Sequence, residues 1–86
     1  MRIYVGNLCM ARTTEAEVRE LFAGFGSVRR LLFKTDYDGK PRGFAFVDMA
    51  DTDGRAAISG LDGFVLHGRR LTVNEARARD EVRRIN

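Results

Sequence analysis

The sequence predicts an α+β sandwich in which an antiparallel sheet carries two helices on one face. Short apolar segments alternate with helical ones in the order strand, helix, strand, strand, helix, strand. The chain has 86 residues, enough for one compact domain and not for two. Its hydrophobic fraction of 44% and charged fraction of 31% are typical of a globular protein in water. The second face of such a sheet is left open to solvent or to a partner.

The first half of the chain predicts a strand, a helix and a second strand. Residues 3–6 are short, apolar and followed by a turn signal, as a strand would be. Thr14 and Glu17 have the spacing of a capping box, in which each side chain bonds the other residue's backbone N–H. Apolar residues then recur at helical spacing: Val18, Leu21, Phe22 and Phe25. Residues 28–34 form the second strand.

The second half predicts a hairpin, a helix and a last strand. Residues 36–39 have turn chemistry, and residues 42–49 form the third strand. Asp51 is the expected N-cap of a second helix, which ends at Asp62. Three further segments follow it in order: an extended stub at 65–66, a turn at His67 and Gly68, and the last strand at 71–75.

Charge and composition exclude several classes of function. The net charge of +3, from 15 Lys and Arg against 12 Asp and Glu, permits a polyanionic partner without requiring one. One cysteine and one histidine cannot supply a Cys/His zinc set or an internal disulfide framework. A lone cysteine favours a reducing compartment, so we expect a cytoplasmic protein, or a nuclear one in a eukaryote.

Membrane insertion and catalysis are also unexpected. No apolar run approaches the roughly 20 residues of a membrane helix, and no basic and apolar leader opens the chain. No nucleophile, base and orienting group stand together, so we expect no enzyme, no cofactor and no metal.

The third strand indicates which face carries its aromatic residues. Side chains alternate along a strand. One face therefore holds Gly43, Ala45, Val47 and Met49, and the other holds Arg42, Phe44, Phe46 and Asp48. The first set is wholly apolar, while the second is bracketed by two charges, and burying an unpaired charge is costly. Phe44 and Phe46 are therefore predicted on the open face.

The other strands agree. Their inward pairs are apolar: Ile3 and Val5, Leu31 and Phe33, Leu71 and Val73. Their outward residues are Arg2, Tyr4, Arg30, Leu32, Lys34, Arg70, Thr72 and Asn74. Each of the three outward rings can bury roughly 150–250 Å². Together they approach the few hundred Å² at which an exposed apolar patch usually marks a binding site. Flat rings beside cations suit single-stranded nucleic acid, because bases stack on rings while Arg and Lys meet phosphates.

Two segments resemble the motifs of the RNA-recognition motif (RRM) family. RGFAFVDM, Arg42 to Met49, looks like its eight-residue RNP motif, and IYVGNL, Ile3 to Leu8, looks like the six-residue partner. The resemblance covers residues 2–77 and includes TEAEVRELFAGFGSV, AAISGLDG and GRRLTVNEA. It implies a ferredoxin-like βαββαβ sandwich with strand order 4-1-3-2. Residues 1–77 are then a single RRM domain and residues 78–86 a basic tail, a layout that also resembles the small one-RRM proteins of bacteria.

The resemblance implies that bases stack on Tyr4, Phe44 and Phe46 and that Arg42 contacts a phosphate. The remaining candidates for RNA contact are Arg2, Arg30, Lys34, Arg70, Asn74, Glu75 and Arg77. The basic residues of the outer strands are equally consistent with plain solubilising charges, and the last two strand residues with a solvated strand end. His67 is expected to be a loop residue without a partner.

The chain is accordingly predicted to bind single-stranded RNA, or single-stranded DNA, without catalysis. The alternative, from another class, is a protein-interaction module whose sheet face or tail accepts a peptide or a second copy. Ala78, Val82 and Ile85 stand at helical spacing in the tail. The tail is therefore either a short helix that covers the sheet or pairs with another chain, or a frayed basic extension.

Overall fold

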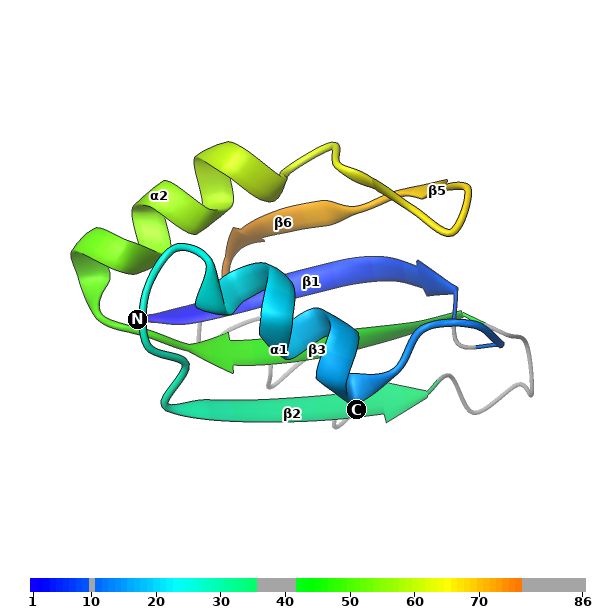
Figure 1. Cartoon of the computed structure of the whole chain (residues 1–86), viewed down its shortest axis with the longest axis horizontal. Helices are drawn as coiled ribbons and strands as arrows, with labels where there is room; N and C mark the ends of the chain where they lie inside the picture. Colours follow the sequence, from blue (N-terminus) through cyan, green and yellow to red (C-terminus); the bar gives the residue numbers. More distant parts are fainter. Residues whose placement is uncertain (10, 36–41, 77–86) are drawn as a thin grey trace.

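The helices and strands occur in the predicted order, with one short hairpin added (Figure 1). The computed structural model describes residues 1–9, 11–35 and 42–76, without the side chains of Thr35 and Arg42. The elements are β1 (Arg2–Cys9), α1 (Glu15–Ala23), β2 (Arg30–Thr35), β3 (Arg42–Asp48), α2 (Asp51–Leu61), β4 (Val65–Leu66), β5 (Arg69–Arg70) and β6 (Thr72–Glu75). The expected turn at 36–39 and tail at 78–86 lie outside the described residues.

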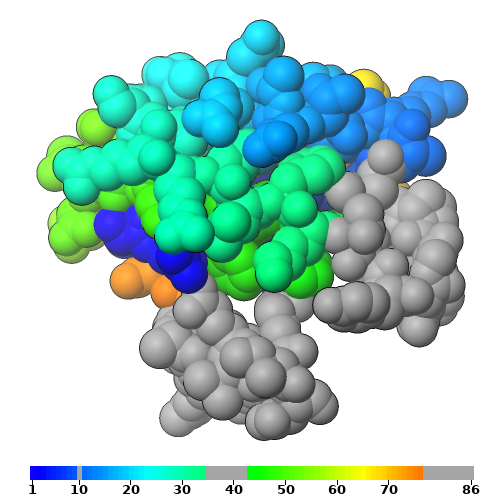
Figure 2. Space-filling model, turned by 90° about the horizontal axis from the view of Figure 1, so that it is seen from below, coloured from blue at the N-terminus to red at the C-terminus, as the bar shows by residue number. Residues whose placement is uncertain are grey.

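Four strands form one antiparallel sheet in the order β2-β3-β1-β6. Since β6 is the fourth strand of this sheet along the chain, the predicted order 4-1-3-2 is confirmed. Both helices lie on one face of the sheet (Figure 1), and the view from the β2 edge shows α1 above that strand (Figure 2). The ferredoxin-like sandwich is therefore the fold of the chain, with β1 and β3 as its central strands.

The core lies between the sheet and the helices and takes alternate residues from each strand. Ile3 and Val5 of β1, and Ala45 and Val47 of β3, have no exposed surface. The rest of the core cluster is Leu8, Val18, Phe22, Leu31, Met49, Ala57, Leu61, Leu71 and Val73. Fully burying one aliphatic side chain of this kind contributes about 1.5–3 kcal/mol. The period-two prediction for the inward face is confirmed.

Helix α1 begins at the predicted capping box. The backbone N–H of Glu17 donates to Thr14 Oγ1 at 3.1 Å, and the N–H of Thr14 donates to Glu17 Oε1 at 3.1 Å. These bonds satisfy donors that the start of a helix otherwise leaves unpaired. Val18 and Phe22, which follow at helical spacing, are buried. The cap therefore fixes where the apolar stripe of α1 starts.

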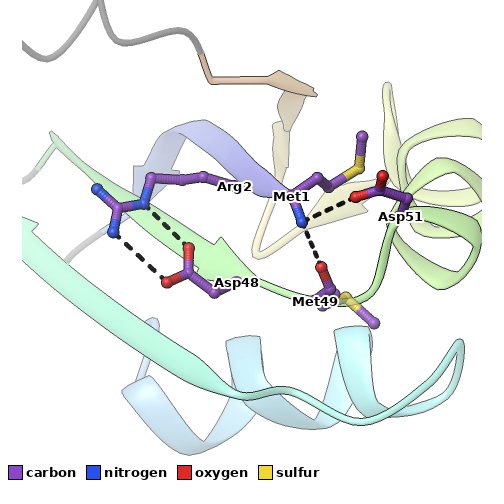
Figure 3. Close-up of polar contacts among 5 residues, drawn as sticks. All are labelled: Met1, Arg2, Asp48, Met49 and Asp51. Carbon is purple, nitrogen blue, oxygen red and sulfur yellow. Dashed lines mark hydrogen bonds and ion pairs between the residues drawn. The ribbon is translucent and has the colours of Figure 1, made fainter.

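The prediction that Asp51 is the N-cap of α2 is wrong. Ala50 is the N-cap, with extended backbone and no side-chain cap bond, and Asp51 is the first helical residue. The Asp51 carboxylate lies 3.1 Å from the amino nitrogen of Met1, which also donates to the Met49 carbonyl at 2.6 Å (Figure 3). An acidic group in the first turn interacts favourably with the helix dipole. Asp51 therefore still marks the start of α2, one residue after the N-cap.

Strand boundaries differ from the prediction where the backbone is irregular. β1 runs on to Cys9 because a bulge after Val5 absorbs Asn7, whose φ is 63°. The last strand, β6, begins one residue later than expected, and β2 begins two residues later than expected. β4 and β5 pair across the expected turn, where His67 and Gly68 have φ of 52° and 79°. Positive φ at both loop residues matches a type I′ hairpin turn.

Replacing Thr14 by Ala should lower the free energy of unfolding by about 1 kcal/mol, because it removes the acceptor of the N-cap bond. Urea unfolding followed by far-UV circular dichroism measures the loss. Thr52→Ala, at an exposed position in the first turn of α2, is the matched control and should change stability by less than about 0.5 kcal/mol. Equal losses in the two variants would contradict the capping role.

Candidate functional site

Three aromatic rings gather on the face of the sheet opposite the core. The ring centroids of Tyr4 and Phe44 are 6.1 Å apart, with 26° between the ring planes. Phe46 meets both rings edge-on, at 5.8 Å from Tyr4 and 5.7 Å from Phe44. We call Tyr4, Phe44 and Phe46 the aromatic cluster. Ring pairs at these separations attract one another, so each ring helps to fix the orientation of the others.

Strand register explains why the rings meet. The pairing of β1 with β3 sets Tyr4 opposite Phe46. On the outer strands, Leu32 lies opposite Phe46 and Asn74 lies opposite Tyr4. Because residues directly opposite one another share a face, these four side chains form a row across the sheet: Leu32, Phe46, Tyr4 and Asn74.

The rings are unequally exposed. Tyr4 and Phe44 are half-buried, whereas Phe46 keeps only 4% of its surface exposed. Phe46 does not belong to the core cluster on the helix side, so its predicted face is confirmed. Its neighbours include the other two rings and the guanidinium carbon of Arg2, 6.0 Å from the Phe46 centroid. Phe46 therefore lies on the predicted face but is largely covered by its neighbours.

Gly6 makes room for the Tyr4 ring. A Cβ atom at Gly6 would lie 2.6 Å from Tyr4 Oη and 2.7 Å from its Cε2, closer than real Cβ contacts. The two residues are two positions apart on one strand, so they share a face and the ring leans along β1. The sequence indicated Gly6 only as a turn signal, because the need for a glycine here depends on how the Tyr4 ring is oriented.

Arg2 and Asp48 form a two-point ion pair at the edge of the aromatic cluster (Figure 3). Arg2 Nε donates to Asp48 Oδ1 at 3.0 Å and Nη2 donates to Oδ2 at 3.4 Å. The two residues are cross-strand partners of β1 and β3, on the face of the cluster. Their side chains are 32% and 28% exposed, so the pair adds only about 0–1 kcal/mol to stability.

Two more candidates lie at the margin of the cluster, and a third lies outside the main sheet. Arg30 and Lys34 are exposed on β2, opposite Asp48 and Phe44 respectively. Arg70 is exposed but belongs to β5, so it stands in the small hairpin and not, as expected, in line with the last strand of the main sheet.

The candidates near the chain end are divided. Asn74 is exposed opposite Tyr4, on the face of the cluster. Glu75 is exposed opposite Ile3, a core residue, so alternation turns it away from the cluster. The side chain of Arg42 and the whole of Arg77 lie outside the described residues.

A polar network that the sequence did not reveal ties the β4–β5 hairpin to the domain. Asn7 Nδ2 donates to the Arg70 carbonyl at 2.8 Å, and Arg69 Nη1 donates to Asn7 Oδ1 at 2.9 Å. His67 Nε2 lies 2.8 Å from Glu17 Oε2, so the expectation that His67 has no partner is wrong. These partners are 50 to 63 residues apart, too distant for any local pattern to indicate them.

The arrangement can hold a flat ligand that carries negative charge. Half-buried rings present faces for stacking, and cations at the margins attract anionic groups. Among the residues that the structure describes, no three His, Cys, Asp or Glu side chains gather as a metal site. Within the same part of the chain, no helix is long and apolar enough to span a membrane.

The family model, the relatives and the solved structure that match this chain all carry names that refer to RNA. The family model described as "RNA recognition motif" matches residues 3–72. A protein of Nostoc sp. named "Putative RNA-binding protein RbpD" is 49% identical over 86 residues, covering 98% of this chain and 90% of its own. One of Synechocystis sp., named RbpA, is 46% identical over 82 residues, covering 93% and 80%. A crystal structure of RNA-binding protein PG1 has a TM-score of 0.76 at 39% identity, covering 88% and 93%.

Gly6→Ala should displace the Tyr4 ring without unfolding the domain, because the new methyl group meets the far end of a side chain that can move. The chemical shifts of the Tyr4 ring protons measure the change. Gly24→Ala is the matched control, since a Cβ there lies 3.5 Å from its nearest neighbour, an ordinary contact. Tyr4 ring signals that stay at their parent positions in Gly6→Ala would contradict the close approach of the Tyr4 ring to Gly6.

Acidification should remove a stabilising contribution from Glu17. The Thr14 backbone N–H, and then His67, hold the pKa of Glu17 below its ordinary value of 4.5. A carboxylate whose pKa is lower in the folded state than in the unfolded state stabilises the fold at pH values above the unfolded-state pKa. This contribution is lost as the pH falls through the folded-state pKa. The stability difference between the parent and Glu17→Gln should therefore shrink from about pH 6 to about pH 3. A difference that grows over this range, measured by thermal unfolding, would contradict the assignment.

Proposed function

Because this chain belongs to the RNA recognition motif family, we propose that it binds single-stranded RNA, or single-stranded DNA, on the face that carries the aromatic cluster. The observation that carries the proposal is the placement of Tyr4 and Phe44, half-buried and stacked on the face opposite the core. Large apolar rings on an open sheet face suit nucleobases, which are flat and stack on any aromatic face.

In the proposed complex, bases stack on Tyr4 and Phe44, while Phe46 holds both rings through its edge-on contacts. Asn74 lies beside Tyr4 in the same row, where its amide can donate to and accept from the edge of a stacked base. Arg2 lies two residues before Tyr4 on β1, on the same face and next to that row. Glu75 is left out of this surface, because register turns it away from the rings.

Phosphate groups are proposed to meet five basic side chains of the chain: Arg30, Lys34, Arg42, Arg70 and Arg77. These contacts give attraction without sequence preference, because every nucleotide carries the same phosphate. Stacking contributes about 1–3 kcal/mol per base by alanine substitution. Micromolar binding corresponds to about 8 kcal/mol in all, so two stacked bases with a few phosphate contacts support affinity in that range.

The proposed function also includes the extent of the binding domain and binding without catalysis. Residues 1–77 act as one binding domain, and residues 78–86 are a basic tail. The matched family model spans residues 3–72, which supports the first of these ranges. The domain binds RNA in the cytoplasm without altering it and needs no cofactor, since stacking and charge neutralisation require none.

Phe44→Ala should weaken binding to an eight-nucleotide oligo(U) by about fivefold or more, since one stacking face is lost. Fluorescence anisotropy at two salt concentrations measures it, and binding by the parent should weaken as salt rises because phosphate contacts release counterions. Phe64→Ala is the matched control, because Phe64 is 40% exposed and lies outside the sheet that carries the cluster. Phe46→Ala is a poorer test, since removing a ring that is 4% exposed also costs stability.

Equal affinity of the parent and Phe44→Ala would count against the stacking surface. Absence of binding to any oligonucleotide, together with a dimer that forms as protein concentration rises, would favour the alternative protein-interaction module.

A further inference from the structure

We propose that Asp48 determines which part of a nucleic acid the Arg2 edge of the cluster accepts. By holding the Arg2 guanidinium, Asp48 withholds it from phosphate, so that this edge takes a nucleobase and not the sugar-phosphate backbone. The inference rests on the proposed function and deepens it, because it assigns one part of the ligand to one edge of the surface.

The geometry of the ion pair supports the first step. Asp48 oxygens lie 3.0 Å from Arg2 Nε and 3.4 Å from Nη2 (Figure 3). These two nitrogens form one side of the guanidinium fork, the arrangement that otherwise receives two oxygens of a phosphate. Asp48 therefore already occupies a bidentate position that a phosphate would use.

The position of the guanidinium supports the second step. Its central carbon lies 6.0 Å from the centroid of Phe46, within the range of a cation–π contact. The planar guanidinium thus lies over the Phe46 ring, and arginine stacks well on flat rings. A nucleobase can continue such a surface because it is flat and uncharged.

Charge supports the third step. Arg2 and Asp48 together carry no net charge, so the edge they form lacks the attraction for phosphate that an unpaired arginine has. If a phosphate displaced Asp48, the carboxylate would stand beside a polyanion, and like charges repel. Arg30 lies opposite Asp48 on β2 and is exposed, so phosphate has a cation to meet on the outer strand instead.

Removing the carboxylate tests the proposal. Asp48→Thr keeps a residue that favours strands and removes the carboxylate that occupies one side of the Arg2 guanidinium. Binding to oligo(U) at low salt should then tighten by about three- to fivefold. The slope of log K against log salt should steepen by about 0.7, the value for one more phosphate contact on a single strand. Glu20→Gln, an exposed position on α1, removes the same charge elsewhere and should leave the slope unchanged.

Arginine variants show whether the gain passes through Arg2. Arg2→Gln alone should leave the salt slope of the parent unchanged, because Arg2 does not meet phosphate in the parent. The double variant Arg2→Gln with Asp48→Thr should return to the parent slope. A parent slope that falls in Arg2→Gln, or a double variant as steep as Asp48→Thr, would overturn the proposal.

A second measurement separates this proposal from RNA binding itself. Pyrophosphate is titrated while the Nε–H signal of Arg2 is followed by NMR, which requires no nucleobase. The signal should shift with pyrophosphate in Asp48→Thr and stay in place in the parent. The same response in both proteins would overturn the role of Asp48 whether or not RNA binds, whereas no binding of RNA by any variant would count against the proposed function alone.

Discussion

The antiparallel pairing of β1 with β3 is the constraint on which the rest of the structure depends. Val5 lies opposite Ala45 and Tyr4 lies opposite Phe46, so one face of the central strand pair is aliphatic and the other aromatic. A slip of one residue would exchange the faces and bring a ring under the helices. Burial of the aliphatic face opposes any such slip, because Val5 and Ala45 have no exposed surface. The hydrophobic core thereby positions the opposite surface, which it does not touch.

The surface that results is built from several weak interactions. Each ring contact contributes little on its own, and the side chains of the Arg2–Asp48 pair remain partly exposed to solvent. Gly6 adds no contact but leaves the space in which the Tyr4 ring lies. A surface of this kind recognises shape and charge more than base identity, which fits tolerant binding of modest affinity.

Some of this structure could be predicted from the sequence because it depends on local patterns. Alternation in the third strand placed Phe44 and Phe46 opposite the core, and the spacing of Thr14 and Glu17 located the start of α1. The limited exposure of Phe46 was not predictable, since it depends on how neighbouring strands pack around it. The contact of His67 with Glu17 joins segments far apart in the sequence, where no periodicity or spacing rule applies.

The central claim is that bases lie against the rings of the sheet face, and intermolecular nuclear Overhauser effects between the protein and a short oligo(U) test it most directly. The account predicts cross-peaks from the ring protons of Tyr4 and Phe44 to base and ribose protons of the RNA. Cross-peaks confined to residues of the helix layer, with neither ring in contact with the oligonucleotide, would contradict it.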